Sequence, residues 1–140
     1  MPEGWRPSEG AELEIAKRVA AHRYDVVLRN VSDIDGVRTP DAYLIRDGVS
    51  EPWEFKRTSE GATNIIENIR NHFRIGKKQA RNVLVYIDRD DVTHGDIERA
   101  MYLAVKRDES GELQQLGILR REGILQVRSR AEVEEHGEIS

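Results

Sequence analysis

The sequence predicts an α/β fold in which helices cover one mixed β-sheet, and three observations support this prediction. Segments with helical spacing of apolar residues alternate with short segments rich in Val, Ile and Leu, which indicate strands. Residues 83–87 form a continuous apolar run, as is typical of a central strand that is buried on both faces. The expected order of elements is αβββαβαββ, which packs as layers of helices on a sheet.

The first half of the chain accounts for one helix and three strands. Residues 9–22 have the apolar spacing of an amphipathic helix, and Ser8 is placed to cap its N-terminus. Three strands are expected to follow, at residues 24–31, 41–45 and 51–57. A turn at residues 46–48 separates the last two strands, so we expect a meander.

The second half supplies two more helices and three strands. Besides the apolar run, we expect helices at residues 62–79 and 93–105 and a closing hairpin at residues 113–119 and 124–127. Thr93 resembles a helix cap, with Asp96 in place of the usual Glu of a capping box. The acidic tail at residues 129–140 is expected to be frayed.

Length and composition limit the chemistry that is available. We interpret residues 1–140 as a single domain, with its core at about 8–128. The chain has no Cys, which excludes disulfides and thiolate metal sites and leaves carboxylates, His and hydroxyls. No apolar run approaches the roughly 20 residues of a membrane span, so we expect no membrane segment in this chain.

Positive charge is concentrated in one part of a chain whose net charge is -4. Residues 54–81 contain seven basic and three acidic residues, so this part carries +4 and the rest carries -8. Its candidate contacts for nucleic-acid phosphates are Arg57, Arg70, Arg74, Lys77 and Lys78. His72 is a further candidate in the same helix, although a charged helix face is often only a solvated face.

Glu54 and Lys56 are the strongest candidates for catalysis. Side chains alternate along a strand, so these two project from one face. Asp41 begins the preceding strand, and an Asp followed on the next strand by Glu-x-Lys is how many metal-dependent nucleases place their catalytic groups. Taken singly, Glu54 and Lys56 are also consistent with a surface ion pair, and Asp41 with a turn residue.

Glu12 is the unusual residue of the first predicted helix. At about 100° per residue it falls within the apolar stripe of Ile15 and Val19, whereas Glu14 falls on the polar side. A carboxylate in a buried stripe requires a positive partner, because an unpaired buried charge is costly. Glu12 is therefore a candidate for the same site, and the alternative is an ion pair with Arg23.

This set of residues is suited to phosphodiester hydrolysis with a divalent metal. The reaction needs a nucleophilic water, charge stabilisation on the phosphoryl oxygens and protonation of the leaving oxygen. Mg²⁺ or Mn²⁺ is favoured over other divalent metals, since both prefer oxygen ligands. We expect Asp41, Glu54 and the Phe55 backbone carbonyl to bind the metal, with Glu12 acting through a water or a second ion. Lys56 is expected to orient or deprotonate the attacking water.

The order αβββαβ with Asp41 and Glu54-x-Lys56 resembles the restriction-endonuclease-like core of the PD-(D/E)xK nuclease superfamily, here extended by a further helix and a C-terminal hairpin. Three longer blocks resemble the C-terminal tRNA-nuclease domains of bacterial contact-dependent growth-inhibition toxins. They are residues 39–42 (Thr-Pro-Asp-Ala), 53–57 (Trp-Glu-Phe-Lys-Arg) and 76–82 (Gly-Lys-Lys-Gln-Ala-Arg-Asn). The resemblance runs from about residue 8 to residue 87.

The resemblance implies specific roles for matched residues. Asp41 and Glu54 would bind metal, Lys56 would be catalytic, and Glu12 fits best the supporting acid of the first helix. Gln79 matches a glutamine of the family's second core helix and would assist at the site or contact phosphate. The implied protein is an endonuclease toxin that acts on tRNA in the cytoplasm, delivered as part of a larger secreted protein and bound by a dedicated immunity protein.

Two alternatives stay open. Cleavage of RNA rather than DNA follows only from the narrower resemblance, so a DNA endonuclease of restriction or repair type is one alternative. The other is an inactive nuclease fold used as a binding module, whose effect would survive Asp41→Ala and Lys56→Ala.

Overall fold

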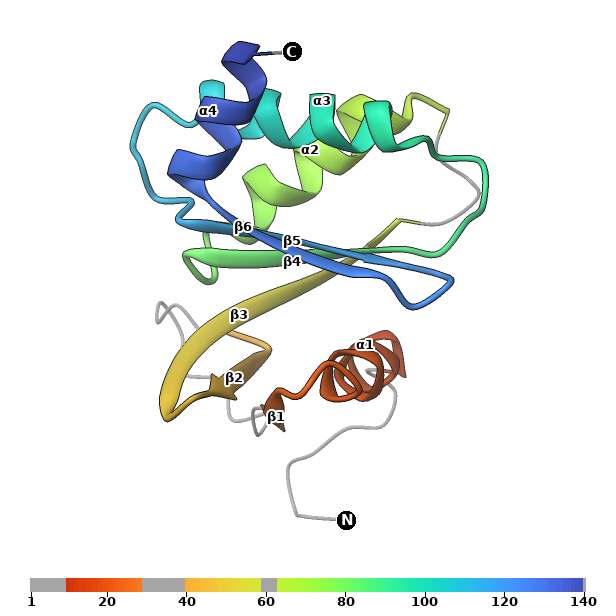
Figure 1. The fold of residues 1–140 in the computed structure, drawn as a ribbon, viewed down its shortest axis with the longest axis vertical. Helices are drawn as coiled ribbons and strands as arrows, with labels where there is room; N and C mark the ends of the chain where they lie inside the picture. Colours follow the sequence, from red (N-terminus) through yellow and green to blue (C-terminus); the bar gives the residue numbers. More distant parts are fainter. Residues whose placement is uncertain (1–9, 29–39, 59–62, 140) are drawn as a thin grey trace.

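The computed structural model describes residues 10–28, 40–58 and 63–139, and the side chains of residues 13–28, 40–58 and 63–135 among them. In this part of the chain, helices and strands follow the predicted order, and one further helix ends it (Figure 1). The elements are α1 (Gly10–Ala20), β1 (Asp25–Leu28), β2 (Ala42–Arg46), β3 (Val49–Thr58), α2 (Ile65–Gly76), β4 (Asn82–Ile87), α3 (His94–Lys106), β5 (Gln115–Arg120), β6 (Leu125–Ser129) and α4 (Arg130–Ile139). None of these helices is long and apolar enough to cross a bilayer. The predicted cap Ser8 lies outside the described residues.

The described strands form one mixed sheet in the order β1-β2-β3-β4-β5-β6, which confirms the predicted fold class. β1, β2 and β3 form the expected antiparallel meander. β4 runs parallel to β3 and β5, and β6 returns antiparallel to β5. The two parallel pairs require crossover connections, which α2 and α3 provide. β4 is buried along its whole length, as predicted for the central strand.

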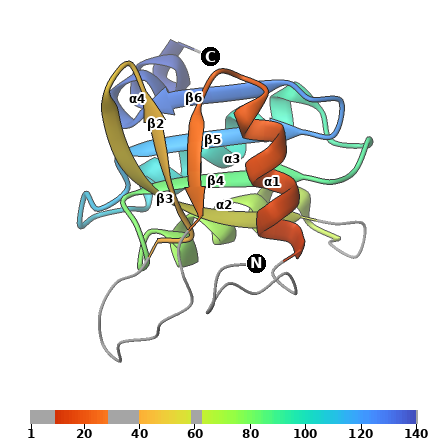
Figure 2. The same cartoon turned by 90° about the horizontal axis from the view of Figure 1, so that it is seen from below.

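Each face of the sheet buries a separate apolar cluster. α2, α3 and α4 lie on one face, and α1 lies on the other (Figures 1 and 2). Under α1, Ile15 and Val19 pack with Trp53 and Phe55 of β3. The buried cluster under α2, α3 and α4 includes residues of β4 and β5 but no described residue of β1, β2 or β3. The apolar cover of this face is therefore centred on β4 and β5.

Local sequence signals account for two of the connections. The turn between β2 and β3 has positive φ at Asp47 (52°) and Gly48 (80°), and an Asp-Gly pair favours this two-residue turn. At the start of α3, the Asp96 N–H donates to Thr93 Oγ1 (3.1 Å), and the Thr93 N–H donates to Asp96 Oδ2 (3.4 Å). The predicted capping box with Asp is therefore present.

The C-terminal segment differs from the frayed tail that its acidity suggests, because it forms α4. The Glu132 N–H donates to Ser129 Oγ (3.2 Å), and the Ser129 N–H donates to Glu132 Oε1 (3.1 Å). Val133 is buried in the cluster that α2 and α3 also cover. The expectation is wrong because a Ser-x-x-Glu capping sequence followed by a buried apolar residue stabilises a helix despite its acidic composition.

Gly76, the last residue of α2, marks a close approach of this helix to β4. A Cβ atom at this position would lie 2.7 Å from Val83 Cγ1, and Val83 is fully buried. We expect Gly76→Ala to lower the free energy of unfolding by about 1–3 kcal/mol through overpacking. This loss would exceed the gain of about 1 kcal/mol in helix propensity.

Gly95→Ala is the matched control for Gly76→Ala. Gly95 lies in α3, where a Cβ atom would meet only Thr93 Oγ1 at 3.8 Å. Urea unfolding of both variants compares them, and we expect no loss of stability for Gly95→Ala. Equal stability of the two variants would contradict tight packing of α2 on β4.

Candidate active site

The β2–β3 hairpin brings Asp41 next to Glu54. The register pairs the first residue of β2 with Trp53, so Asp41 lies beside the following residues of β3. The Phe55 N–H donates a hydrogen bond to Asp41 Oδ2 (2.8 Å), which fixes this carboxylate at the edge of β3. Trp53 and Phe55 are buried against α1, so Glu54 and Lys56 project from the opposite face, as the alternation predicts.

Glu54 is a buried carboxylate with an incomplete set of partners. Its residue is 6% exposed, and its Oε2 lies 3.4 Å from Lys56 Nζ. Its Oε1 is buried and has no hydrogen-bond partner among the described residues. Burial, followed by the nearby Asp41 carboxylate, raises the pKa of Glu54 to about 8, and Lys56 opposes this effect. When Glu54 is ionised, the site holds two carboxylates and one ammonium group, an excess of negative charge that a cation would offset.

The donor set fits a hard divalent cation that also uses substrate oxygens. Mg²⁺ is commonly held by one or two carboxylates together with waters and substrate phosphates. Asp41 and Glu54 are such a pair, and the Phe55 carbonyl belongs to the same strand as Glu54. Asp41 and Glu54 therefore match a site at which waters and substrate oxygens supply the remaining ligands. Among the described side chains, no group of three or more His, Asp or Glu is placed to hold a metal ion.

α2 adds a histidine to the Lys56 side of this group. Burial, and then the positive charge of Lys56, lower the pKa of His72. One turn earlier in α2, Asn68 Oδ1 accepts a hydrogen bond from Thr58 Oγ1 (2.7 Å), which ties the helix to the end of β3. α2 therefore adds a partly buried histidine, with a lowered pKa, to this side of the sheet.

Two predicted catalytic residues are not joined to this group by the described contacts. Glu12 lies in α1, but its side chain is outside the described part of the chain. Gln79 is exposed in the turn after α2, where its backbone N–H donates to the Gly76 carbonyl (2.9 Å). Its side chain forms no hydrogen bond with a described residue. The roles of Glu12 and Gln79 stay predictions.

Two of the five predicted phosphate contacts form ion pairs with carboxylates from distant parts of the chain. On the α1 face, Arg57 Nε donates to Asp88 Oδ2 (3.1 Å). Lys77 Nζ lies 2.6 Å from Asp108 Oδ1, and Asp108 is only 2% exposed. Burial raises the pKa of Asp108, but hydrogen bonds to its carboxylate, first that from Lys77, outweigh burial and lower it to about 2. Lys77 therefore stabilises a buried carboxylate.

The other three cations recur at four-residue spacing along α2 and its C-terminal turn. Arg70 Nε is 2.9 Å from Glu67 Oε2, and Arg74 donates to Asn71 Oδ1. Arg74 and Lys78 are exposed, whereas Arg70 is partly buried. Positions four residues apart share a helix face, so Arg70 and Arg74 lie on one face of α2, and Lys78 follows in the turn after the helix.

Comparison with known protein families shows which family the chain belongs to. The family described as contact-dependent growth inhibition CdiA C-terminal domain matches residues 38–125, which is more than half of the sequence. The chain belongs to this family. The matched part of this CdiA C-terminal domain contains Asp41, Glu54 and Lys56 but not α1. A comparison with curated proteins gives no match.

The fold of this CdiA C-terminal domain is similar to that of a solved structure, described as the CdiA-CT/CdiI toxin and immunity complex from Burkholderia pseudomallei. The similarity covers 92% of each chain, with a TM-score of 0.60 and 18% sequence identity. At this identity, the similarity establishes the mixed α/β fold and leaves the chemistry to the residues themselves.

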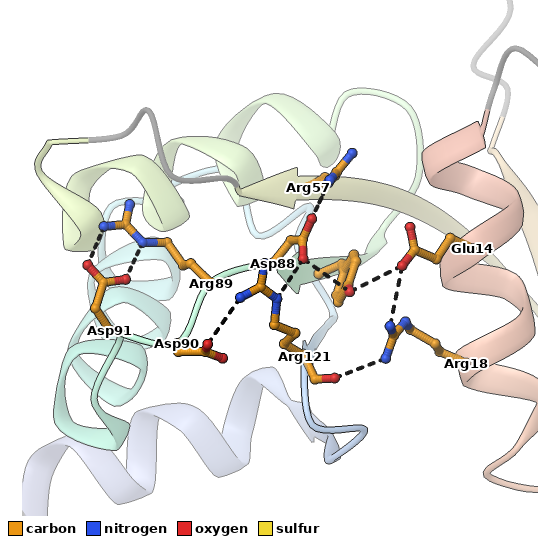
Figure 3. Close-up of polar contacts among 9 residues, drawn as sticks. Glu14, Arg18, Arg57, Asp88, Arg89, Asp90, Asp91 and Arg121 are labelled. Carbon is orange, nitrogen blue, oxygen red and sulfur yellow. Dashed lines mark hydrogen bonds and ion pairs between the residues drawn. The ribbon is translucent and has the colours of Figure 1, made fainter.

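The CdiA C-terminal domain has a second polar cluster, on the α1 face at the carboxyl end of β4 (Figure 3). Arg121 Nε donates to Asp88 Oδ1 (3.1 Å), and the Tyr86 hydroxyl lies 3.4 Å from both Asp88 Oδ1 and Glu14 Oε1. Arg18 Nη1 donates to the Arg121 carbonyl (3.0 Å). The cluster therefore ties α1 to β4 and to the β5–β6 turn, and Glu14 is one of its members and not only solvated.

Proposed function

We propose that this domain is a metal-dependent endonuclease of the PD-(D/E)xK type. The observation that carries the proposal is the environment of Glu54, a buried carboxylate beside Asp41 and Lys56 whose Oε1 has no described partner. A buried carboxylate beside a second carboxylate destabilises a protein unless a cation compensates it. Such costly groups with strongly shifted pKa values concentrate at functional sites.

The proposed roles follow from the positions of these groups. Asp41 and Glu54, with the Phe55 carbonyl, would hold Mg²⁺ or Mn²⁺. Glu12 is not assigned to this set, because α1 covers the opposite face of the sheet. When bound, the ion supplies charge stabilisation on the phosphoryl oxygens and makes an attacking water more acidic. Lys56 would orient or deprotonate this water, or balance the negative charge of the transition state.

Activity is expected to rise with pH from about 6 to above 8. Glu54 must lose its proton to bind a cation, and its pKa is raised to about 8. We expect single-turnover cleavage at a fixed, subsaturating Mg²⁺ concentration to increase over this range and then to level off. A rate that is independent of pH between 6 and 9 would contradict the role of Glu54.

The proposed substrate is tRNA. This choice rests on the resemblance of residues 39–42, 53–57 and 76–82 to tRNA-nuclease domains. Arg70, Arg74 and Lys78 would contact the phosphate backbone, and Gln79 would assist at the site or contact phosphate.

We also propose that the domain acts as a toxin. The family assignment and the toxin and immunity complex of the structural neighbour support this role. The domain would be delivered to the cytoplasm of a target cell as part of a larger secreted protein, and a dedicated immunity protein would bind it.

The proposed activity is tested by incubating the purified domain with tRNA and with duplex DNA, in Mg²⁺, in Mn²⁺ and in excess chelator. We expect tRNA fragments with either metal and intact tRNA with chelator. Cleavage of duplex DNA alone would favour the DNA endonuclease. Cleavage that persists undiminished in chelator would contradict metal dependence, and intact tRNA and DNA in all conditions would contradict the nuclease.

A further inference from the structure

The sheet face that carries Glu54 continues into an exposed surface around Tyr43. Ala42 and Leu44 are buried against α1, so Tyr43 between them projects to the opposite face, the face of Glu54. Tyr43 is 40% exposed, and Val27, its partner across the β1–β2 pair, is 51% exposed. An aromatic ring is therefore presented to solvent on the face of the proposed site.

The register places Tyr43 on the same sheet face as both proposed metal ligands. Tyr43 pairs with Pro52, so Glu54, two residues further along β3, is its diagonal neighbour across the pair. The Cα atoms of diagonal neighbours in an antiparallel pair are about 7–8 Å apart. Asp41 precedes Tyr43 by two residues and lies at the same edge of β3. The buried cluster under α2, α3 and α4 includes no described residue of β1, β2 or β3.

Tyr43 also differs from the other tyrosines of the described chain in its contacts. The rings of Tyr24 and Tyr102 lie under Arg46 and Lys106. The Tyr86 hydroxyl belongs to the polar cluster on the α1 face. Among the described residues, Tyr43 has neither a hydrogen bond to its hydroxyl nor a cation over its ring.

We propose that Tyr43 is a stacking platform for an unpaired nucleobase next to the phosphate that is cut. This inference rests on the proposed nuclease function and names its substrate class, an RNA whose cleavage site is single-stranded. Every nucleobase has a flat face that stacks on an aromatic side chain, whatever the sequence. The bases of an RNA duplex are already stacked on one another, so only a loop, bulge or end supplies a base that can be splayed out.

Binding to the Lys56→Ala protein tests this platform without cleavage. The probes are a fluorescently labelled single-stranded RNA and a perfect duplex that contains the same strand. Adding Tyr43→Ala is expected to weaken binding of the single strand about 5- to 150-fold, the range found for removal of one stacking partner. Tyr43→Phe is expected to retain binding, because the ring alone stacks, and the duplex affinity is expected to change little.

Two further variants make the test secure. Val49→Ala changes an exposed residue of the same hairpin that alternation places on the opposite face, and it is expected to leave both affinities unchanged. Tyr43→Thr replaces the ring with a side chain that suits a strand and is expected to act like Tyr43→Ala if the fold is intact. Thermal unfolding of each variant verifies the fold.

Equal affinity of Tyr43→Ala and its parent for the single strand would overturn the platform and leave a protein partner as the occupant of this face. An equal loss for single strand and duplex would also overturn it, because stacking on an unpaired base predicts a difference. Failure of the nuclease proposal is a separate result, seen as the absence of metal-dependent cleavage by protein that retains Lys56 and Tyr43.

Discussion

Glu54→Gln and Lys56→Ala are each expected to lower the rate of tRNA cleavage by at least about 100-fold, as loss of a metal ligand or a general base should. Gln cannot carry the negative charge of Glu54, and its amide nitrogen is a poor ligand for Mg²⁺. Ala removes the only described ammonium group that lies within 4 Å of Glu54. The measurement is the single-turnover rate at pH 8.5 with saturating Mg²⁺.

Glu51→Gln is the matched control for this experiment. Glu51 lies on the same strand, but its position in the alternation puts it on the other face, where it accepts a hydrogen bond from Gln115 Nε2 (2.6 Å). We expect its rate to stay within a few-fold of wild type. A rate near that of wild type for either Glu54→Gln or Lys56→Ala would contradict the catalytic assignment.

Glu54→Gln is also expected to make the metal-free domain more stable at alkaline pH. The folded-state pKa of Glu54, about 8, lies above the ordinary value of 4.5, so the folded protein holds this proton more tightly than the unfolded chain does. Wild-type stability should therefore fall as pH rises from about 4.5 and level off above about 8. At about 1.4 kcal/mol per pH unit, the loss due to Glu54 is at most about 5 kcal/mol.

Urea unfolding in chelator at pH 5, 7 and 9 measures this difference. Glu54→Gln and wild type should have similar stabilities at pH 5, and the variant should be more stable by the widest margin at pH 9. Saturating Mn²⁺ should stabilise wild type at pH 9 and have little effect on the variant, because only a bound ligand shifts the unfolding equilibrium. Parallel pH profiles of the two proteins would contradict the raised pKa of Glu54.

Much of the geometry of the candidate site follows from local sequence rules. The alternation of side chains predicts that Glu54 and Lys56 share a face, and the two-residue Asp47-Gly48 turn fixes the register that brings Asp41 beside them. These predictions need only neighbouring residues and a short hairpin. They are confirmed because the physical rules that govern them act over a few residues.

The ion pairs could not be predicted in the same way, because their partners come from distant segments. Lys77 reaches Asp108 across a whole strand and helix, and Arg57 reaches Asp88 through the parallel pairing of β3 with β4. From the concentration of basic residues in this part of the sequence, Arg57 and Lys77 are both predicted to contact nucleic acid. Only the tertiary structure shows that each compensates a carboxylate of the same chain.

The exposure of Tyr43 also depends on long-range packing. The sequence indicates a strand with alternating faces, but it does not reveal that the helices centre their apolar cover on β4 and β5. α4 is different, since its Ser129-x-x-Glu132 cap is visible in the sequence and is outweighed there by the acidity of the tail. Composition is therefore a weaker guide than capping residues at the end of a domain.

Calorimetric titration of Mn²⁺ into the domain at pH 8.5 tests most directly whether Asp41 and Glu54 form a divalent-metal site. We expect wild type and Glu51→Gln to bind Mn²⁺ with similar affinity, and we expect binding to weaken as the pH is lowered to 6.5. Glu54→Gln is expected to lose at least about 10-fold in affinity, since the variant lacks a carboxylate ligand. Equal Mn²⁺ affinity in Glu54→Gln and wild type would show that Glu54 does not bind the metal.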